Sequence, residues 1–316
     1  MGSAMFVGGA VGFIVAVGAV PVLRRITWFG DLLALALPAG CVALVVLGVW
    51  VQWLGGVPAA VGASVGVIAG FVIHCARPRR HISAPASPSA LLLASVNLQY
   101  DSEDPHATVQ SALEVGADVL VAAEVTTQTH PLLAAAFQYA LVAEAGLRVN
   151  NNAVGIYAQV PFEELSPPPR SGREALRVRV LGPRPFVLYA VHLPRPVLRY
   201  DGTTGLVSLA EHRRAIRRLD LAIRAETEPV VLVGDLNLSD RTDGYRVLTA
   251  RRLDAMRTAK PVRSTFHGGW RWWWLLFRID HCIVPPDWCV SDAATFAIRG
   301  SDHRGLRGRL APAPAP

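Results

Sequence analysis

Polar side chains stand at the ends of several apolar, strand-like runs that follow residue 90. These residues are Asn97, Glu124, His192, Asp235, Asn237, Asp280, Asp302 and His303. Carboxylate and amide oxygens suit a hard cation such as Mg²⁺, and imidazoles can move protons near neutral pH. The sequence has neither the Cys/His spacing of a zinc site nor a glycine-rich phosphate loop. The set therefore predicts magnesium-assisted hydrolysis rather than nucleotide-dependent transfer.

Each of these residues also has a structural explanation when it is considered alone. Glu124 fits an edge carboxylate, Asn97 and Asn237 fit turn formers, and Asp302 fits a helix or turn cap. A lone histidine such as His192 is more often a satisfied core residue than a catalytic one. The combination of oxygen donors with two histidines is what favours a functional site.

The elements that must position this set alternate between strands and helices. Strand-like runs cover 91–98, 118–125, 154–160, 176–181, 186–193, 230–238, 278–284 and 289–298. Helical patterns cover 107–115, 131–144 and 206–225. Several of the strands are apolar on both faces, and such strands need cover on both sides. The periodicity therefore predicts a layered α/β or α+β domain.

The first 76 residues indicate a membrane component. The chain is 52% hydrophobic and only 17% charged, and its mean hydropathy of +0.33 is high for a soluble protein. Apolar runs at about 4–23, 32–53 and 57–76 are each long enough to cross a bilayer as a helix. A cleaved signal peptide is rejected because the N-terminus has no early charge and two further spans follow. We expect three transmembrane helices.

Charge gives an orientation for these spans. Five arginines flank them, at positions 24, 25, 77, 79 and 80. With three spans all five lie on the same side of the membrane, so the positive-inside rule places the following domain in the cytoplasm. Five arginines and one aspartate precede residue 91, so the formal net charge of +7 falls to +3 over the rest of the chain. This modest charge is weak support for a nucleic-acid partner.

The expected domain boundaries follow composition. A membrane domain occupies 1–76, and a basic linker rich in Pro, Ser and Ala occupies 77–90. The catalytic domain then occupies 91–310, and the closing residues 311–316 form a disordered tail. Cys282 and Cys289 are close enough in sequence to pair, but two buried thiols on neighbouring strands are the favoured interpretation.

Three short motifs in unbroken order carry a family resemblance. They are GDLN at 234–237, RID at 278–280 before an apolar strand, and SDH at 301–303. With them, the chain resembles the endonuclease/exonuclease/phosphatase superfamily, the deoxyribonuclease I-like group, and in particular its membrane-anchored bacterial members. The segment ADVLVAAEV is similar to the family strand that delivers a metal-binding glutamate, although Ala123 replaces the usual glutamine. His192 resembles the deoxyribonuclease and sphingomyelinase branches rather than the apurinic branch, which has a tyrosine there.

The resemblance implies a four-layered α/β sandwich, in which two packed β-sheets are flanked by helices and the site lies at one end of the sheets. It also implies a metal site. Glu124, helped by Asn97, is expected to hold Mg²⁺, with Mn²⁺ as the alternative ion. Asp302 is expected to complete the metal shell.

The resemblance further implies how protons move. His303, oriented by Asp280, is expected to act as the general base for an attacking water, with Asp235 as the open alternative for that role. Asp235 and Asn237 would position the water and the phosphate. His192 would donate a hydrogen bond or a proton toward the phosphate and the leaving oxygen.

An aromatic run, WRWWWLLF at 270–277, precedes the RID motif. Part of it is expected to pack inside the domain. The functional interpretation is an exposed lip, with Trp272 and Trp273 contacting the bilayer or a lipid tail, because tryptophan favours the membrane interface. The arginines near position 215 more simply form a solvated helix face than a phosphate-backbone site.

Three functions remain open. The first is a membrane-tethered, Mg-dependent phosphohydrolase that cleaves a phosphoester or phosphodiester in a lipid head group or a lipid-linked phosphate. The second is a membrane-anchored nuclease, which the low charge disfavours. The third is a non-catalytic binding platform on the same fold, disfavoured because the expected acids, amides and histidines are present.

The bilayer and its lipids are the expected partners, and no protein partner is inferred. The protein is expected in the cell membrane, as a multi-pass protein. Similar membrane-bound family members can place their catalytic domain outside the cell, and this analogy opposes the cytoplasmic orientation that the charges predict.

Overall fold

The computed structural model describes residues 90–150, 152–166, 174–182, 184–196, 206–258, 264–267 and 278–313. The chain divides into two compact units. The larger unit, made of 80–240, 244–271 and 276–316, holds every strand described below. The smaller unit, made of 1–79, 241–243 and 272–275, lies almost wholly outside the described residues.

The three expected transmembrane helices and nearly all of the expected linker fall outside the described residues. Within the described ranges, none of the helices has both the length and the apolar character needed to cross a bilayer. The membrane domain therefore stays a prediction.

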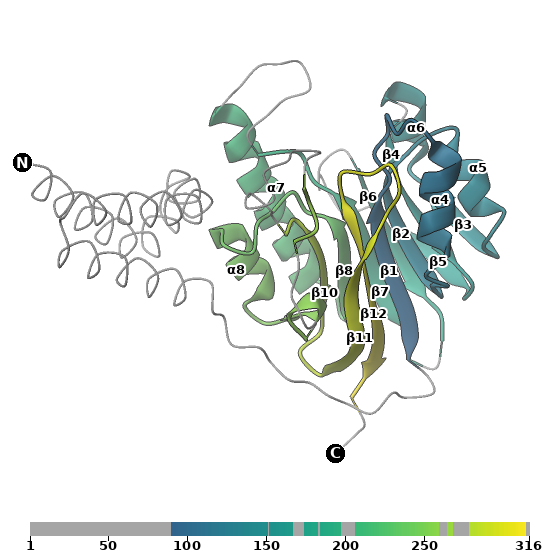
Figure 1. Cartoon of the computed structure of the whole chain (residues 1–316). Helices are drawn as coiled ribbons and strands as arrows, with labels where there is room; N and C mark the ends of the chain where they lie inside the picture. Colours follow the sequence, from purple (N-terminus) through teal and green to yellow (C-terminus); the bar gives the residue numbers. More distant parts are fainter. Residues whose placement is uncertain are drawn as a thin grey trace, which may run out of the picture. The chain divides into compact units, whose positions relative to one another are not determined.

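Two six-stranded β-sheets form the centre of the larger unit (Figure 1). The first sheet has the order β11 (Trp288–Ala297), β12 (Arg304–Pro312), β1 (Leu91–Asn97), β2 (Val119–Val125), β4 (Ala153–Ala158) and β3 (Tyr139–Val142). The second has the order β5 (Phe162–Leu165), β6 (Glu174–Val180), β7 (Phe186–His192), β8 (Val230–Asp235), β10 (Asp280–Val284) and β9 (Leu253–Asp254). Strands β1 and β2 are parallel, as are β7 and β8, and the other described pairs are antiparallel.

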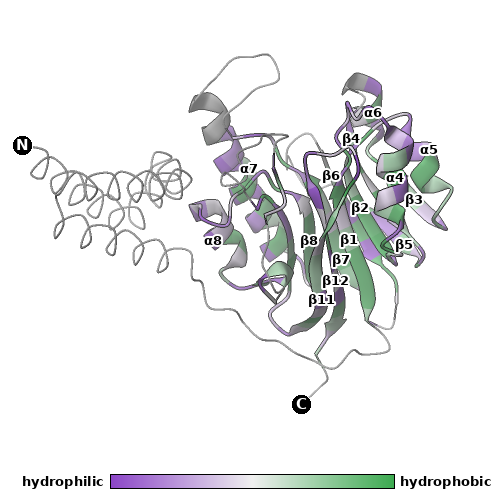
Figure 2. Cartoon of the chain, in the orientation of Figure 1, coloured by the Kyte–Doolittle hydropathy of each residue, from purple (hydrophilic) through white to green (hydrophobic). Residues whose placement is uncertain are grey.

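The strands are apolar on both faces because both faces are covered. One core cluster joins the facing sides of the two sheets and includes Val121, Leu188 and Val233, each fully buried. The outer face of the first sheet packs against α4 (Pro105–Leu113) and α5 (Thr129–Ala134). The outer face of the second sheet packs against α7 (Leu206–Arg224) and α8 (Asp243–Thr249). Figure 2 shows β1, β2 and β7 as largely hydrophobic ribbons. The predicted α/β sandwich of two packed sheets with helices is confirmed.

The expected helix over 131–144 is wrong. The chain there forms the short helix α5, then strand β3, and then helix α6 (Glu144–Asn150). An alanine-rich stretch favours a helix by local propensity, but pairing of Tyr139 through Val142 with β4 overrides that preference. The last strand, β12, runs on to Pro312, two residues past the expected end of the catalytic domain at residue 310.

Candidate active site

The polar residues predicted from the sequence meet at one edge of the two sheets. Asn97 and Glu124 lie at the ends of the parallel strands β1 and β2, and His192 and Asp235 end the parallel strands β7 and β8. Parallel strands deliver their carboxyl ends to the same edge of a sheet. The antiparallel strand β10 begins at this edge with Asp280, which pairs with Asp235 across the sheet.

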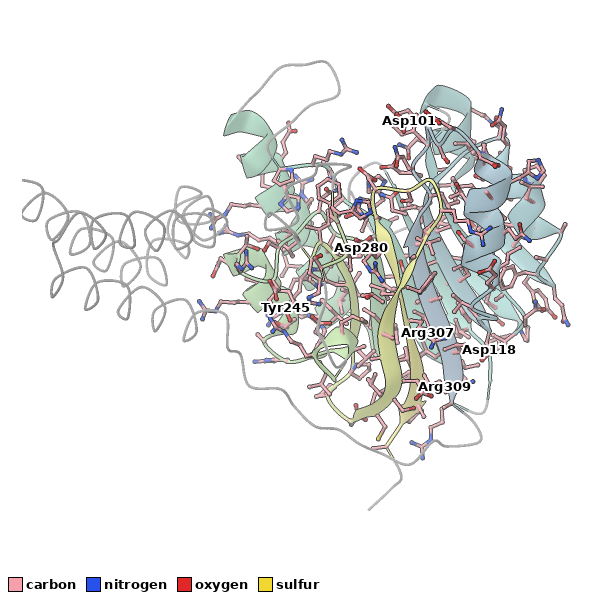
Figure 3. The ribbon with its side chains drawn as sticks, in the orientation of Figure 1. Asp101, Asp118, Tyr245, Asp280, Arg307 and Arg309 are labelled. Atoms are coloured by element: carbon pink, nitrogen blue, oxygen red, sulfur yellow. The ribbon has the colours of Figure 1, made fainter. Side chains whose placement is uncertain are left out.

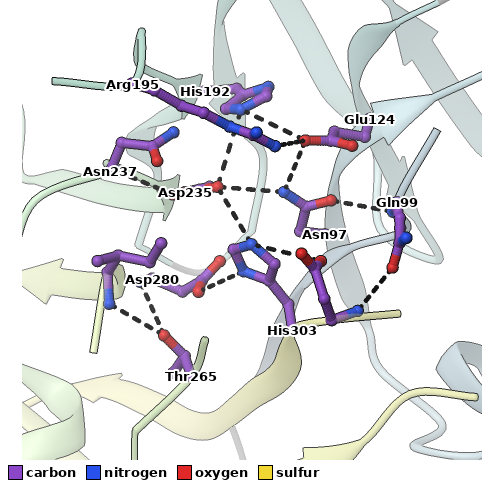
Figure 4. A network of polar contacts seen from close by, with 12 residues as sticks. Asn97, Gln99, Glu124, His192, Arg195, Asp235, Asn237, Thr265, Asp280 and His303 are labelled. Atoms are coloured by element: carbon purple, nitrogen blue, oxygen red, sulfur yellow. Dashed lines mark hydrogen bonds and ion pairs between the residues drawn. The ribbon is translucent and has the colours of Figure 1, made fainter. Parts of the chain in front are cut away.

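The side chain of Asn97 connects the two sheets. Its amide nitrogen donates to Glu124 Oε1 at 3.2 Å and to Asp235 Oδ2 at 3.1 Å (Figure 4). Its amide oxygen accepts the Gln99 backbone N–H at 3.0 Å. Asn97 is 1% exposed, so it fixes the relative positions of two buried carboxylates. The predicted role as a metal ligand would need the amide oxygen, which here faces Gln99.

Glu124 sits on an irregularity of β2. Its φ of +57° is unusual for a residue with a side chain, and the register against β4 shifts between Ala122 and Val125. The Tyr100 backbone N–H donates to Glu124 Oε2 at 3.0 Å. This bulge aims the carboxylate at the site rather than along the regular alternation of the strand.

The GDLN motif forms a tight turn after β8. Asp235 Oδ1 accepts the Asn237 backbone N–H at 2.8 Å, and the Asn237 side-chain amide donates to the Leu193 carbonyl at 2.9 Å. Asn237 has a φ of +46°, which asparagine tolerates better than most residues. Because its amide nitrogen is engaged by Leu193, Asn237 ties the loop after β7 to the loop after β8.

His303 and Asp280 form a buried dyad. His303 Nδ1 lies 2.9 Å from Asp280 Oδ2, and both side chains are 3% exposed. The other ring nitrogen, Nε2, lies 3.8 Å from Asp235 Oδ2 and 3.9 Å from Asp302 Oδ1. The carboxylate thus orients the ring so that Nε2 faces the other acids of the site.

Residues that the sequence analysis did not select hold this dyad in place. The Thr265 hydroxyl oxygen accepts the Asp280 backbone N–H at 3.0 Å. The Ser301 hydroxyl donates to the Asn97 carbonyl at 2.8 Å and accepts the His303 backbone N–H at 3.0 Å. Ser301 belongs to the SDH motif but was given no role from the sequence, and Thr265 carries no pattern that distinguishes it from an ordinary loop residue, so the tertiary structure identifies both roles.

His192 and Asp302 lie at the open side of the site. His192 Nε2 is 3.9 Å from Glu124 Oε1 and 3.8 Å from Asp235 Oδ2. The Asp302 side chain is 26% exposed, and its backbone N–H donates to the side-chain oxygen of Gln99 at 2.7 Å. The His192 side chain is 10% exposed, so both residues are more accessible than Glu124, Asp235 and His303.

The electrostatics of the site are dominated by buried carboxylates. Burial, followed by the neighbouring charge of Asp280, raises the pKa of Asp235 above its usual range. Burial also raises the pKa of Asp302. Burial alone would lower the pKa of His303, but the charges of Asp280, Asp235 and Asp302 outweigh it and raise that pKa to about 10. Such an excess of negative charge favours a bound cation.

A second buried network lies behind the RID motif. Arg278 donates to Asp254 Oδ2 at 2.6 Å, and the Tyr245 hydroxyl donates to the same carboxylate at 2.7 Å. His281 Nε2 lies 2.6 Å from the Leu238 carbonyl, next to the GDLN turn. Burial alone would raise the pKa of Asp254, but Arg278 and His281 hold it well below its usual range. This network supports the turn and β10. Figure 3 shows Tyr245 and Asp280 with the surrounding side chains, and Arg307 and Arg309 farther along β12.

The donor set fits a divalent metal ion. Asp235, Asp280 and His303 each offer a ligand atom, and these atoms lie within 4.8 Å of one another. The buried carboxylate of Glu124 and the partly exposed carboxylate of Asp302 add further oxygens to the site. Hard cations prefer such oxygens.

Arg195 is a functional candidate that the sequence analysis missed. Its guanidinium NH2 lies 3.7 Å from Glu124 Oε1, and its side chain is 41% exposed. Figure 4 shows it reaching over the site from the loop after β7. Its position three residues after His192 was the only available signal.

The aromatic lip stays a prediction, because Trp272 and Trp273 lie outside the described residues. Cys282 and Cys289 are free thiols, as favoured from the sequence. The expectation that both are buried on neighbouring strands is wrong, because Cys282 is buried on β10 whereas Cys289 is partly exposed on β11 of the other sheet.

The chain is similar to known proteins in both sequence and fold. Residues 94–303 match the model of the Endonuclease/Exonuclease/phosphatase family. No curated protein sequence matches the chain. Among solved structures, an endonuclease/exonuclease/phosphatase from Beutenbergia cavernae DSM 12333 is 20% identical, with a TM-score of 0.54 over 72% of this chain and 73% of that one.

Two further solved structures share the fold. An AP endonuclease from Archaeoglobus fulgidus is 17% identical, with a TM-score of 0.54 over 69% of this chain and 98% of its own. The 3′ phosphatase NExo from Neisseria, bound to product DNA hairpin, is 16% identical, with a TM-score of 0.55 over 70% of this chain and 100% of its own. At these identities the likeness establishes the fold alone.

Proposed function

Because the chain belongs to the endonuclease/exonuclease/phosphatase family, we propose that it is a membrane-tethered phosphohydrolase that uses a divalent metal ion to cleave a phosphoester or phosphodiester. The observation that carries the proposal is the convergence of Glu124, Asp235, Asp280 and His303, from four different strands or strand ends, on one buried edge. A structural role does not explain so many buried acids beside an imidazole, because burying unpaired charge is costly.

In this proposal Glu124 and Asp302 hold the metal ion, Mg²⁺ or Mn²⁺. Asp280 and His303 are assigned to water activation instead, because the hydrogen bond between His303 Nδ1 and Asp280 Oδ2 orients the ring and leaves His303 Nε2 for the attacking water. When bound, the ion polarises a phosphoryl oxygen and offsets the negative charge of the transition state. Asn97 would keep Glu124 and Asp235 aligned through its two N–H bonds, and its expected role as a metal ligand stays a prediction.

His303 is the proposed general base, and Asp280 is the residue that orients it. The charges of Asp280, Asp235 and Asp302 raise the pKa of His303 to about 10. With a cation held by Glu124 and Asp302, part of this negative charge would be cancelled, and the pKa of His303 would fall toward the working pH. Asp235 and Asn237 then position the attacking water and the phosphate, and His192 donates toward the phosphate and the leaving oxygen.

The proposed substrate is a lipid head group or a lipid-linked phosphate. Its support is the apolar N-terminal segment, since tethering would concentrate the site at a bilayer, together with the aromatic run that contains Trp272 and Trp273. The alternative is a membrane-anchored nuclease, because two proteins of similar fold are an AP endonuclease and a 3′ phosphatase bound to a DNA hairpin. Exposed acids at 101, 103 and 104 follow directly after Tyr100, which contacts Glu124, and would repel a polyanionic duplex.

A substrate panel tests the proposal. The full chain is assayed in detergent or vesicles against phospholipids, polyprenyl phosphates and DNA, with Mg²⁺ or with a chelator, beside His303→Ala. We expect metal-dependent release of phosphate or head group from a lipid, and a loss of roughly 10²- to 10⁴-fold in kcat for His303→Ala. Cleavage of DNA alone would support the nuclease alternative, and no metal-dependent cleavage of any ester would support the binding platform.

The aromatic run has its own test on the same panel. Changing Trp272 and Trp273 to Ser should weaken activity on lipid-borne substrate while sparing a small soluble phosphodiester. Equal loss on both substrates would remove the lip from the proposal.

A further inference from the structure

We propose that Arg195 is a phosphate-binding residue that makes the site prefer phosphate monoesters over diesters; this inference rests on the proposed function. Arg195 lies in the loop after β7, three residues beyond His192. Its guanidinium is 3.7 Å from Glu124 Oε1, and its charge also stabilises the ionised form of Asp302. It therefore faces the two carboxylates assigned to the metal ion.

The contact with Glu124 differs from the structural ion pairs of this protein. Arg177 on β6 donates two hydrogen bonds to the Glu226 carboxylate, at 2.7 and 2.9 Å. The Arg177 side chain is 24% exposed. The guanidinium NH2 of Arg195 approaches Glu124 Oε1 at 3.7 Å, and its side chain is 41% exposed. Charge-assisted hydrogen bonds are about 2.7–2.9 Å long. The Arg195–Glu124 contact therefore lacks the close bidentate geometry of the Arg177–Glu226 pair.

The chemistry of the guanidinium indicates the ligand. Its planar fork of N–H donors matches two oxygens of a phosphate, and it keeps its charge at any working pH. Beside four carboxylates, a phosphate ester would be repelled unless cations face it. Arg195 and His192 supply protein donors at the open side of the site. A terminal monoester carries close to two negative charges at neutral pH and a diester carries one, so the attraction to Arg195 favours the monoester.

Arg195 and a metal ion also share one partner. A divalent cation held by Glu124 competes with the guanidinium for the same carboxylate oxygen. Removing Arg195 should therefore leave metal affinity unchanged or increase it, while phosphate affinity falls. A merely structural arginine would not separate the two affinities in this way.

The experiment measures binding and turnover on the full chain. Inorganic phosphate binding is followed by calorimetry in the presence of Mn²⁺, and Mn²⁺ binding is followed by electron paramagnetic resonance. For Arg195→Ala we expect phosphate to bind roughly tenfold to a hundredfold more weakly, with Mn²⁺ affinity equal or higher. Arg195→Lys keeps the charge but loses the fork, so its phosphate affinity should be intermediate. Arg148→Ala, which removes an exposed arginine paired with Glu144 on α6, should match the parent.

The turnover arm compares p-nitrophenyl phosphate with bis(p-nitrophenyl) phosphate. Arg195→Ala should raise KM for the monoester at least several-fold more than for the diester. Unchanged phosphate affinity, or an equal effect on the two esters, would overturn the inference. If the parent hydrolyses no ester, the proposed function fails, and the calorimetric comparison alone still decides whether Arg195 binds phosphate.

Discussion

The imidazole of His303 lies against Asp280 on one side and faces Asp235 on the other. The distances differ by almost an ångström, and only the shorter contact, at 2.9 Å, is a hydrogen bond. Asp280 therefore fixes the ring, whereas Asp235 Oδ2 lies beyond hydrogen-bonding distance of His303 Nε2. This asymmetry assigns the orienting role to one acid and a positioning role to the other.

Asp280→Asn tests that division of roles. The carboxylate of Asp280 raises the pKa of His303, so removing its charge should lower that pKa. A base works only when unprotonated, and the rate therefore rises with pH through the pKa of His303. The acidic limb of the kcat/KM profile should move to lower pH, and the maximal rate should fall by about 10²-fold or more because the ring loses its orienting partner.

The measurement is kcat/KM against pH at saturating Mg²⁺, with Asp118→Asn as control. Asp118 accepts the Leu92 backbone N–H at 2.7 Å and is not a site residue. An acidic limb that stays in place in Asp280→Asn would show that a group other than His303, with Asp235 the first candidate, takes the proton.

At the scale of elements, the site depends on how closely β7 and β8 approach. Gly234 precedes Asp235 and pairs with Val191, with a φ of +135° that residues with side chains rarely adopt. A Cβ there would lie 2.1 Å from the Val191 carbonyl oxygen. Gly234→Ala should therefore cost about 3 kcal/mol or more in free energy of unfolding.

Chemical denaturation of Gly234→Ala checks this expectation, with Gly182→Ala as the matched control. A Cβ at Gly182 meets nothing within 4 Å, so that variant should stay within roughly 0.5 kcal/mol of the parent. If the two alanine variants were equally stable, the close approach of β7 and β8 would not be a real constraint.

Helix α7 contributes a buried histidine to the same region. His212 is 3% exposed, and its Nε2 donates to the Leu236 carbonyl at 3.0 Å, inside the GDLN turn. Burial lowers the pKa of His212 to about 4. The unfolded chain, with a histidine pKa near 6.5, binds the proton first as pH falls. Stability is thus fully present above about pH 6.5 and is lost progressively down to about pH 4, by roughly 3 kcal/mol.

His212→Gln isolates this effect, because glutamine keeps an N–H donor for Leu236 but does not titrate. Unfolding free energies measured from pH 7 to pH 4 should fall less steeply for the variant than for the parent. Parallel curves for the two proteins would mean that His212 does not contribute to the acid sensitivity of the domain.

For the molecule as a whole, the sequence predicted the layers and the principal acids better than the connections between them. Apolar strands that end in Asn97, Glu124 and Asp235 could be read directly, because burial on both faces leaves a strong signal. Strand β3 could not, since its pairing with β4 is a tertiary effect that opposes local helix propensity. Arg195 could not either, because nothing in an arginine on a loop indicates which carboxylate it will face.

The last question at this scale is how the catalytic domain relates to the membrane. The apolar runs before residue 77 and the five arginines around them predict insertion with the domain in the cytoplasm. We expect the full chain to stay in the membrane fraction after alkaline washing.

Leu221 on α7 is 67% exposed, so Leu221→Cys offers a labelling position on the domain, with the parent as background control. A membrane-impermeant maleimide should leave this variant unlabelled in intact cells and label it once detergent opens the membrane. Labelling in intact cells would place the domain outside, and release of the chain by alkaline washing would remove the transmembrane anchor altogether.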